Sequence, residues 1–443
     1  MPPIILPVRP ELSLVAILGY AFLAFVVGLL FTPAFVAFLR KNRLGKQLRV
    51  ETVDGREASI FRKYHEKKFG TPTMGGILIW GSIGITIILS RVFSLFGFVE
   101  NSLMQRGQVY APLFVLLSLG VLGAIDDYLN VIGNEESQWR RWMKAINWTS
   151  IVSVLAVIAL FGWELWSRGI AGLREPHDLH PLAVLGLYVL LLVAIGSTII
   201  ALDDLSKRLR PESVLKQKKK GGLGVLPKIM SLLVISALAA CWFYFKNGYD
   251  SVAIPFAANL GLPAVLEIGM WYIPLFVFIV IGTANAVNVT DGLDGLAGGL
   301  LVIAFSGFGF LAYMSGLAIL AAFCAVCAGA VAAFLWHNVP PALFYMGDTG
   351  ALALGGALGA IALMIDRVLL LPLLGFIFLI EMLSVILQLS SKRLRGGKKI
   401  FRAAPIHHHF EALEWGESKV TMRFWIAGAF VAFLGVVIGL HGF

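Results

Sequence analysis

Residues 14–39 read LVAILGYAFLAFVVGLLFTPAFVAFL, an apolar run without a single charged side chain. About 20 apolar residues in a helix suffice to cross the hydrocarbon core of a bilayer, because each residue adds ~1.5 Å. The sequence therefore predicts an all-α integral membrane protein, a polytopic helical bundle of about twelve transmembrane helices. We expect the spans near residues 13–39, 74–96, 110–125, 147–166, 181–202, 223–245, 272–289, 296–315, 317–336, 349–365, 368–390 and 421–441.

The composition excludes an ordinary soluble protein. Hydrophobic residues make up 58% of the 443 residues and charged residues 14%, whereas soluble domains carry about 25% charged residues. The first apolar run is too long for the h-region of a cleaved signal peptide, so we expect it to remain as the first span. Cys241, Cys324 and Cys327 fall within predicted spans, which favours buried packing over zinc or redox chemistry.

The basic residues mark one side of the membrane. If the loop after the first span is cytoplasmic, 29 of the 36 Lys and Arg residues lie on the inner side, within residues 40–68, 140–144, 207–228 and 392–423. This asymmetry predicts that both termini face outward. The net charge of +10 then reflects topology and contact with anionic lipid, so we expect membrane lipid as a partner and no nucleic acid. The outer loop 246–271 has room for a short hairpin.

Five groups of polar residues stand at the inner ends of different spans. Because the cations alone set the topology, this convergence is an independent indication of an active site. Taken singly, most of the groups also suit a helix cap or a solvated turn. In chain order the groups contain Lys68 with residues 71–76; Asp126 and Asp127; Asn288, Asp291 and Asp294; Tyr345 and Asp348; and His407, His408 and His409.

The residue types in these groups indicate phosphate chemistry. Several carboxylates without thiols favour a hard cation, Mg²⁺ above all. Asp348 follows a glycine at the start of a span, where helix-end N–H groups and a metal would together hold a diphosphate; a simple N-cap is the alternative. Asp126 and Asp127 point about 100° apart on a helix, so we expect different tasks for them. Three adjacent histidines without nearby cysteines suit phosphate or sugar oxygens better than zinc.

The motifs around these groups carry a family resemblance. In order, the chain reads GTPTMGG at 70–76, NAVNVTDGLDG at 285–295, MGDTG at 346–350, SVILQ at 384–388, PIHHHF at 405–410 and RFW at 423–425. In these motifs, and from about residue 40 to the end, the sequence resembles the bacterial phospho-N-acetylmuramoyl-pentapeptide transferases.

The resemblance implies one membrane-embedded transferase domain, residues 1–443, in the bacterial inner membrane with its active site facing the cytoplasm. It implies transfer of phospho-MurNAc-pentapeptide from UDP-MurNAc-pentapeptide to undecaprenyl phosphate, giving lipid I and UMP, the first membrane step of peptidoglycan synthesis. A second copy of the chain is a further candidate partner.

The resemblance also implies site residues. Asp126, Asp127 and Asp348 match the family's essential acids, with Asp348 as the Mg²⁺ ligand. Tyr345 stands where the family has a phenylalanine that stacks on uracil. The residues implied around the nucleotide substrate are Lys68, Asn288, Asp291, Asp294, Gln388, His407, His408 and His409.

The chain departs from the family in one region. The family has ten spans, and the Lys-Gly-Leu segment that closely follows its aspartate pair stands here only at 220–223. We infer a two-helix insertion at about 132–217. It contains a second acidic pair, Asp203 and Asp204, but Asp126 and Asp127 are followed by the family's tyrosine and lie one hairpin from residues 71–76.

Two other functions remain as alternatives. A polyprenyl-phosphate GlcNAc-1-phosphate transferase would use the same chemistry, although the triple-histidine motif favours the muramoyl substrate. A transporter would place its polar site near the bilayer midplane, whereas these groups cluster at one interface. The choice between direct transfer and a covalent aspartyl-phosphate intermediate stays open.

Overall fold

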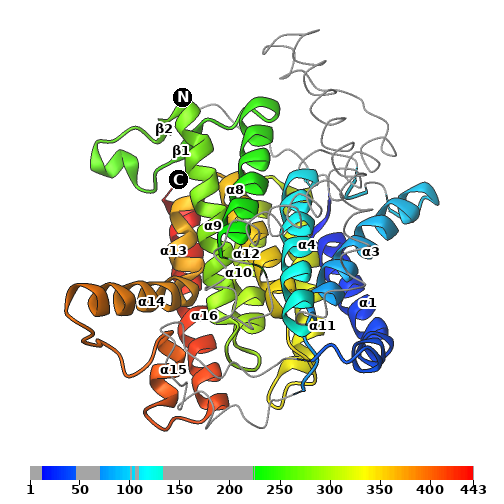
Figure 1. Ribbon diagram of the computed structural model, residues 1–443. Helices are drawn as coiled ribbons and strands as arrows, with labels where there is room; N and C mark the ends of the chain where they lie inside the picture. Colours follow the sequence, from blue (N-terminus) through cyan, green and yellow to red (C-terminus); the bar gives the residue numbers. More distant parts are fainter. Residues whose placement is uncertain are drawn as a thin grey trace.

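Long helices run side by side and form a bundle in this computed structural model, which describes residues 12–45, 70–99, 102–104, 109–132, 223 and 225–442 (Figure 1). The longer helices are α1 (Leu14–Lys41), α3 (Gly76–Leu95), α4 (Tyr110–Ile132), α8 (Val225–Cys241), α9 (Tyr272–Thr290), α10 (Leu296–Met314), α11 (Ala318–Asn338), α12 (Gly347–Met364), α14 (Phe376–Leu394) and α16 (Glu417–His441). Two short helices, α13 (Leu371–Leu374) and α15 (Ile406–Glu411), flank α14.

The expectation of an all-α polytopic membrane protein is confirmed. Within the described residues, nine helices are long and apolar enough to cross a membrane, and a bent pair would supply a tenth span. These ten correspond to ten of the twelve predicted spans. The other two, near 147–166 and 181–202, lie outside the described residues, as does nearly all of the inferred insertion, so the count of twelve stays a prediction.

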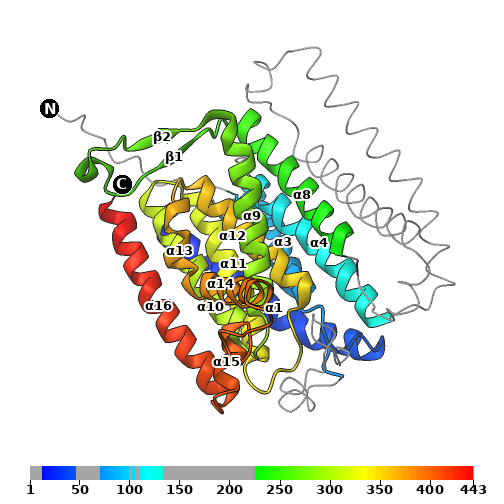
Figure 2. The ribbon, with the colours of Figure 1, turned by 60° about the vertical axis from the view of Figure 1, so that its left-hand side comes forward.

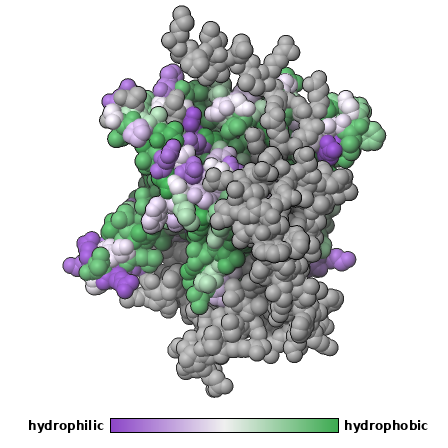
Figure 3. Space-filling view, turned by 90° about the horizontal axis from the view of Figure 1, so that it is seen from above, coloured by the Kyte–Doolittle hydropathy of each residue, from purple (hydrophilic) through white to green (hydrophobic). Residues whose placement is uncertain are grey.

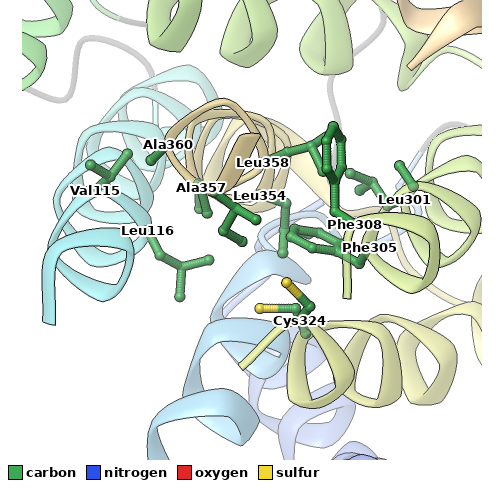
Figure 4. Packing of buried hydrophobic residues seen from close by; sticks show 14 of the residues in the cluster. Val115, Leu116, Leu301, Phe305, Phe308, Cys324, Leu354, Ala357, Leu358 and Ala360 are labelled. Atoms are coloured by element: carbon green, nitrogen blue, oxygen red, sulfur yellow. The ribbon is translucent and has the colours of Figure 1, made fainter. Parts of the chain in front are cut away.

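Helix α12 forms the centre of the bundle (Figure 2). Every residue from Thr349 to Met364 is buried, and the helix packs against α3, α4 and α9. Its core contacts are shown in Figure 4, where α12 lies between α4, carrying Leu116, and α10, carrying Phe305. Cys324 and Cys327 are fully buried in the same hydrophobic core, which confirms that these two cysteines pack as apolar residues.

The predicted span at 368–390 is broken rather than continuous. The segment Val368–Leu374 and helix α14 are bent by 85° relative to each other, and α14 projects sideways from the bundle (Figure 1). Its face toward the protein is polar, with Glu381, Ser384, Gln388 and Ser391 all buried, whereas leucines and isoleucines such as Leu383 and Ile386 are exposed. A helix with this inverted polarity presents its apolar face to lipid and its polar face to the protein.

The end of the bundle opposite the start of α12 carries the expected hairpin. Strands β1 (Ser251–Ala253) and β2 (Val265–Glu267) pair antiparallel, with Val252 opposite Leu266. The backbone N–H of Phe256 donates to the carbonyl of Gly442 at 2.6 Å, so the chain's C-terminal end lies at this end of the bundle. Figure 3 looks onto this end and shows hydrophilic residues among hydrophobic ones.

Candidate active site

Helix α12 begins at a point where three acidic side chains gather. Gly347 has a φ of 72°, a left-handed conformation that favours glycine. A Cβ there would also lie 2.3 Å from Oδ2 of Asp127, so only glycine leaves room for that carboxylate. The next residue, Asp348, stands in the first turn of α12, where free backbone N–H groups favour negative charge.

Asp127 caps this helix. Its Oδ1 accepts a hydrogen bond from the backbone N–H of Asp348 at 3.2 Å, and its Oδ2 accepts from the backbone N–H of Thr349 at 3.0 Å. The Thr349 hydroxyl donates to the same Oδ2 at 2.6 Å. The alternative role of N-cap, which the sequence allowed for Asp348, therefore belongs to Asp127, a residue from another helix.

Asp126 and Asp348 are joined by a lysine. The Nζ of Lys228 donates to Oδ2 of Asp126 at 2.9 Å and also to Oδ2 of Asp348. The second oxygen of Asp348 accepts from the side-chain amide of Asn288 at 2.7 Å, and the second oxygen of Asp126 accepts from the backbone N–H of Leu223 at 2.7 Å. The ends of α4, α8, α9 and α12 therefore meet in one polar network.

The helices can meet so closely because their contact positions are small. Gly123 stands on α4 just before the aspartates, and a Cβ there would come within 2.2 Å of the Asp348 carbonyl. Small residues at helix contacts in membrane proteins let backbones approach in this way. The side chains of Lys228 and Asp348 keep 23% of their surface exposed, so the network is open to a ligand on one side.

The donor set suits Mg²⁺ held jointly with a substrate. Within the described ranges, no three His, Cys, Asp or Glu side chains, these three acids included, are arranged to hold a metal ion by themselves. Mg²⁺ usually binds one or two carboxylates together with water and substrate phosphates. Asp348 and Asp126, which both pair with Lys228, offer the two carboxylates.

The loop between α9 and α10 holds the next two predicted residues. Asp291 ends α9. Asp294 is buried, its Oδ2 accepts from the backbone N–H of Ala342 at 3.0 Å, and its own N–H donates to Glu417 at 2.7 Å. Asp294 thus ties this loop to the segment before α12 and to α16.

Tyr345 lies beside this loop, just before α12. Its backbone N–H donates to the carbonyl of Pro72 at 2.8 Å, which brings the 71–76 motif to the start of α12. Burial raises the pKa of the Tyr345 phenol, and the carboxylates of Asp294 and Asp291 raise it further. The phenol is therefore neutral near pH 7, and two acids of the loop lie near enough to act on it.

The three histidines differ in their surroundings. His407 is fully buried, with Nδ1 3.0 Å from Oε2 of Glu381. His408 places Nδ1 2.6 Å from Oε2 of Glu411 and keeps 19% of its side chain exposed. Nδ1 of His409 accepts from the backbone N–H of Arg402 at 3.2 Å. Of His407 and His408, only His408 has surface to offer a ligand in this conformation.

Gln388 holds a turn. Its Oε1 accepts from the backbone N–H groups of Ile400 and Phe401, both at 3.0 Å, and its Nε2 donates to the Phe401 carbonyl at 2.9 Å. Its amide therefore orders the segment between α14 and α15. Lys68 and the second pair, Asp203 and Asp204, lie outside the described residues.

Sequence reasoning missed Lys228. The cation count takes it as one basic residue at the inner end of a span, and the structure places it in the first turn of the apolar helix α8. A single cation inside an apolar span is costly without a partner, and that cost is the signal that marks it. Glu381 was missed for a related reason, because its partner, His407, comes from a later helix.

Known proteins are similar to this chain over most of its length. A model of glycosyl transferase family 4 matches residues 186–366. A phospho-N-acetylmuramoyl-pentapeptide-transferase of Bacillus pumilus is 32% identical, covering 94% of this chain and 95% of that protein. Proteins of the same name from Anoxybacillus flavithermus, at 31% over 95% and 97%, and from Chloroflexus aurantiacus, at 32% over 94% and 88%, agree. This chain belongs to the phospho-N-acetylmuramoyl-pentapeptide-transferase family.

Proposed function

We propose that this protein transfers phospho-MurNAc-pentapeptide from UDP-MurNAc-pentapeptide to undecaprenyl phosphate, giving lipid I and UMP. The observation that carries the proposal is the network of Asp126, Lys228, Asp348 and Asn288 at one end of the spans. Phosphoryl transfer mainly needs aligned phosphates and neutralised charge, and this network combines carboxylates for a metal with a cation for phosphate oxygens. We choose these substrates because the chain belongs to the phospho-N-acetylmuramoyl-pentapeptide-transferase family.

Each residue of the network has a separate task in this proposal. Asp348 would hold Mg²⁺, which when bound polarises the diphosphate as a Lewis acid. Lys228 is partly exposed between the two acids and can donate to diphosphate oxygens as they arrive. Charge-assisted hydrogen bonds of this kind are stronger than neutral ones.

Asp126 and Asp127 have different roles in the proposed reaction. Both oxygens of Asp127 accept hydrogen bonds from the start of α12, so Asp127 keeps Asp348 in place. Asp126 orients the lipid phosphate and accepts its proton if it carries one, through the oxygen that Lys228 releases when it donates to the diphosphate. An oxygen of that phosphate then bonds to the sugar-bearing phosphorus while the bond from this phosphorus to the oxygen of UMP breaks.

We place the protein in the bacterial inner membrane, with this site facing the cytoplasm. The support is the distribution of basic residues, which favours that side for the loops next to the site. The nucleotide substrate is soluble and the acceptor is a lipid, so a site at the membrane interface is within reach of both.

Release of UMP tests the function directly. Purified protein would receive undecaprenyl phosphate, Mg²⁺ and either UDP-MurNAc-pentapeptide or UDP-GlcNAc, with Asp348→Asn as the inactive control. We expect UMP and a lipid-linked product from the muramoyl donor alone. Turnover of UDP-GlcNAc alone would replace the proposal with the GlcNAc-1-phosphate transferase, and turnover of neither would reject both.

A further inference from the structure

Helix α14 buries a carboxylate where the sequence is otherwise apolar. Glu381 is fully buried on the protein-facing side of the helix. An ionised carboxylate without a partner is costly in such a place, so a buried one is paired and usually serves a function. Glu381 is not among the site residues expected from the sequence.

The partner of Glu381 is His407, which comes from α15. Oε2 of Glu381 lies 3.0 Å from Nδ1 of the imidazole, and the backbone N–H of His407 donates to the same oxygen at 3.5 Å. Since a carboxylate only accepts hydrogen bonds, the pairing assigns a proton to Nδ1 and fixes the ring's orientation. Carboxylates hold functional histidines in this way behind many metal and catalytic sites.

The Nε2 edge of the His407 ring contacts the loop that follows α9. Its Nε2 is buried and has no hydrogen-bond partner among the described residues. A Cβ on Gly292 would lie 2.3 Å from this nitrogen, so the loop backbone rests directly against the ring. The His407 ring also contacts that of His408, with ring centroids 4.1 Å apart and the ring planes at 61°.

His407 therefore acts by packing between neighbouring segments of the protein rather than by touching a ligand. It joins α14 to the 291–295 loop and to the partly exposed His408. That loop begins with Asp291, directly after the helix whose Asn288 binds Asp348. A shift of the ring would move the loop and His408 together.

We propose that Glu381 is a positioning residue for the nucleotide-sugar donor, acting through His407 on the Gly292 loop and on His408. The inference rests on the proposed function. We favour the nucleotide sugar over the lipid as the substrate held here. Asp291 suits N–H and O–H groups that donate hydrogen bonds, and the neighbouring Tyr345 suits an aromatic base. Uracil, sugar and peptide offer such groups, whereas a polyprenyl phosphate has only hydrocarbon and an anion.

Steady-state kinetics with both substrates varied tests this assignment. Glu381→Gln keeps the size of the side chain and removes its charge. We expect the KM for UDP-MurNAc-pentapeptide to rise about tenfold, in the range for lost supporting carboxylates, while the KM for undecaprenyl phosphate stays within about twofold. Ser384→Ala is the matched control, because Ser384 is buried on the same face and, among the described residues, bonds only to the carbonyl of Glu381 in its own helix. It should leave both values unchanged.

Two further variants show whether Glu381 acts through the histidine. In Gly292→Ala the new Cβ displaces the ring while the carboxylate remains, and the same selective rise in the donor KM should follow. The double variant Glu381→Gln/His407→Asn should be no worse than His407→Asn alone, since residues that act as one unit are not additive. All variants are compared well below their unfolding temperatures.

The outcomes separate this inference from the proposed function. An equal rise in both KM values, or a lower unfolding temperature with unchanged kinetics, would show a purely structural pair and overturn the inference. Additive effects in the double variant would do the same. Inactivity of the wild-type protein with the muramoyl donor would instead reject the function on which the inference rests.

Discussion

The carboxylate of Asp127 binds the helix that carries Asp348. It accepts the backbone N–H of Asp348 at 3.2 Å and that of Thr349 at 3.0 Å, so a residue at the end of α4 completes the first turn of α12. The metal-binding acid of the proposed mechanism is thereby held by a second acid, although the two stand more than two hundred positions apart in sequence. This relationship gives Asp127 and its neighbour Asp126 different consequences when they are changed.

Asp127→Asn should lower both stability and turnover. A lost cap or charge-assisted hydrogen bond costs about 1–2 kcal/mol, and the displaced Asp348 should slow the reaction at least about a hundredfold, as removal of a catalytic group does. Asp126→Asn should slow it similarly, but it should lower stability through the lost ion pair with Lys228 rather than through the start of α12. Thr349→Val, which loses only the hydroxyl, should fall between Asp127→Asn and wild type in stability. Thermal unfolding in detergent and UMP release measure the two effects, and wild-type stability of Asp127→Asn would contradict the capping role.

Asp348→Asn should nearly abolish activity while the fold persists. A neutral amide binds Mg²⁺ far less well than a carboxylate, so we expect a loss of more than about tenfold, or ~1.4 kcal/mol in the barrier. Wild-type protein stripped with a chelator should regain UMP release on addition of Mg²⁺, and the variant should not.

The control for Asp348 stands at the far end of the same helix. Asp366 follows α12 and accepts the backbone N–H of Ala253 at 2.9 Å, far from the acidic network. Asp366→Asn should keep wild-type turnover within about twofold. If Asp348→Asn kept more than a tenth of the wild-type rate, the assignment of Asp348 as metal ligand would be wrong.

Lys228→Met should be as harmful as loss of an acid. The change leaves two carboxylates facing each other without a cation, and breaking a buried ion pair costs about 3–5 kcal/mol. We expect turnover to fall at least about a hundredfold, and Lys228→Arg to restore only part of it, because a planar guanidinium does not replace a point charge. Lys41→Met, at the exposed end of α1, controls for loss of a basic residue near the membrane. Wild-type rates in Lys228→Met would remove the lysine from the mechanism.

The spans were predictable because a membrane helix needs a long apolar run and little else. The bend before α14 was not predictable from hydropathy. A hydropathy window averages over the exposed Leu383 and the buried Glu381, so it does not show which face of the helix is polar. The residue spacing held the information: Glu381, Ser384, Gln388 and Ser391 recur every three or four positions, which places them on one face.

Local motifs identify the acids of the site, but they do not show which role each acid has. Nothing local distinguishes Asp126 from Asp127, and only the close approach of α4 to α12 shows which one caps the helix. The place of Gln388 and His407 near the nucleotide stays a prediction, and the structure adds that their polar atoms bond to a turn and to Glu381. Partners that come from other segments cannot be read from a motif.

Cysteine labelling should show the two ends of the bundle on opposite sides of the membrane. In a protein with Cys241, Cys324 and Cys327 changed to alanine, Asn247→Cys near the hairpin should react with an impermeant reagent only from outside. Lys399→Cys, beyond α14, should react only after the membrane is opened. The positive-inside rule gives this direction. Labelling of Asn247→Cys from the cytoplasm alone would invert the topology, and unchanged UMP release would show that the cysteine-free protein is intact.

The last prediction separates the two acidic pairs. Asp203 and Asp204 stand next to Lys207 and Arg208 in the sequence, a setting in which acids form exposed ion pairs worth only ~0–1 kcal/mol each. Changing both to asparagine should therefore alter turnover by less than about tenfold, or ~1.4 kcal/mol. Asp126→Asn is the matched comparison, and it should cost at least about a hundredfold. UMP release at saturating Mg²⁺ measures both variants, with expression and unfolding temperature checked for each.

The reverse result would relocate the reaction. If the Asp203/Asp204 variant lost activity and Asp126→Asn kept it, the second pair would supply the catalytic acid. The contact between Lys228 and Asp126 would then be a structural ion pair, and Asp127→Asn would affect stability alone. Because these three consequences are measured independently, they decide together whether the acids at the end of α4 act on the substrate.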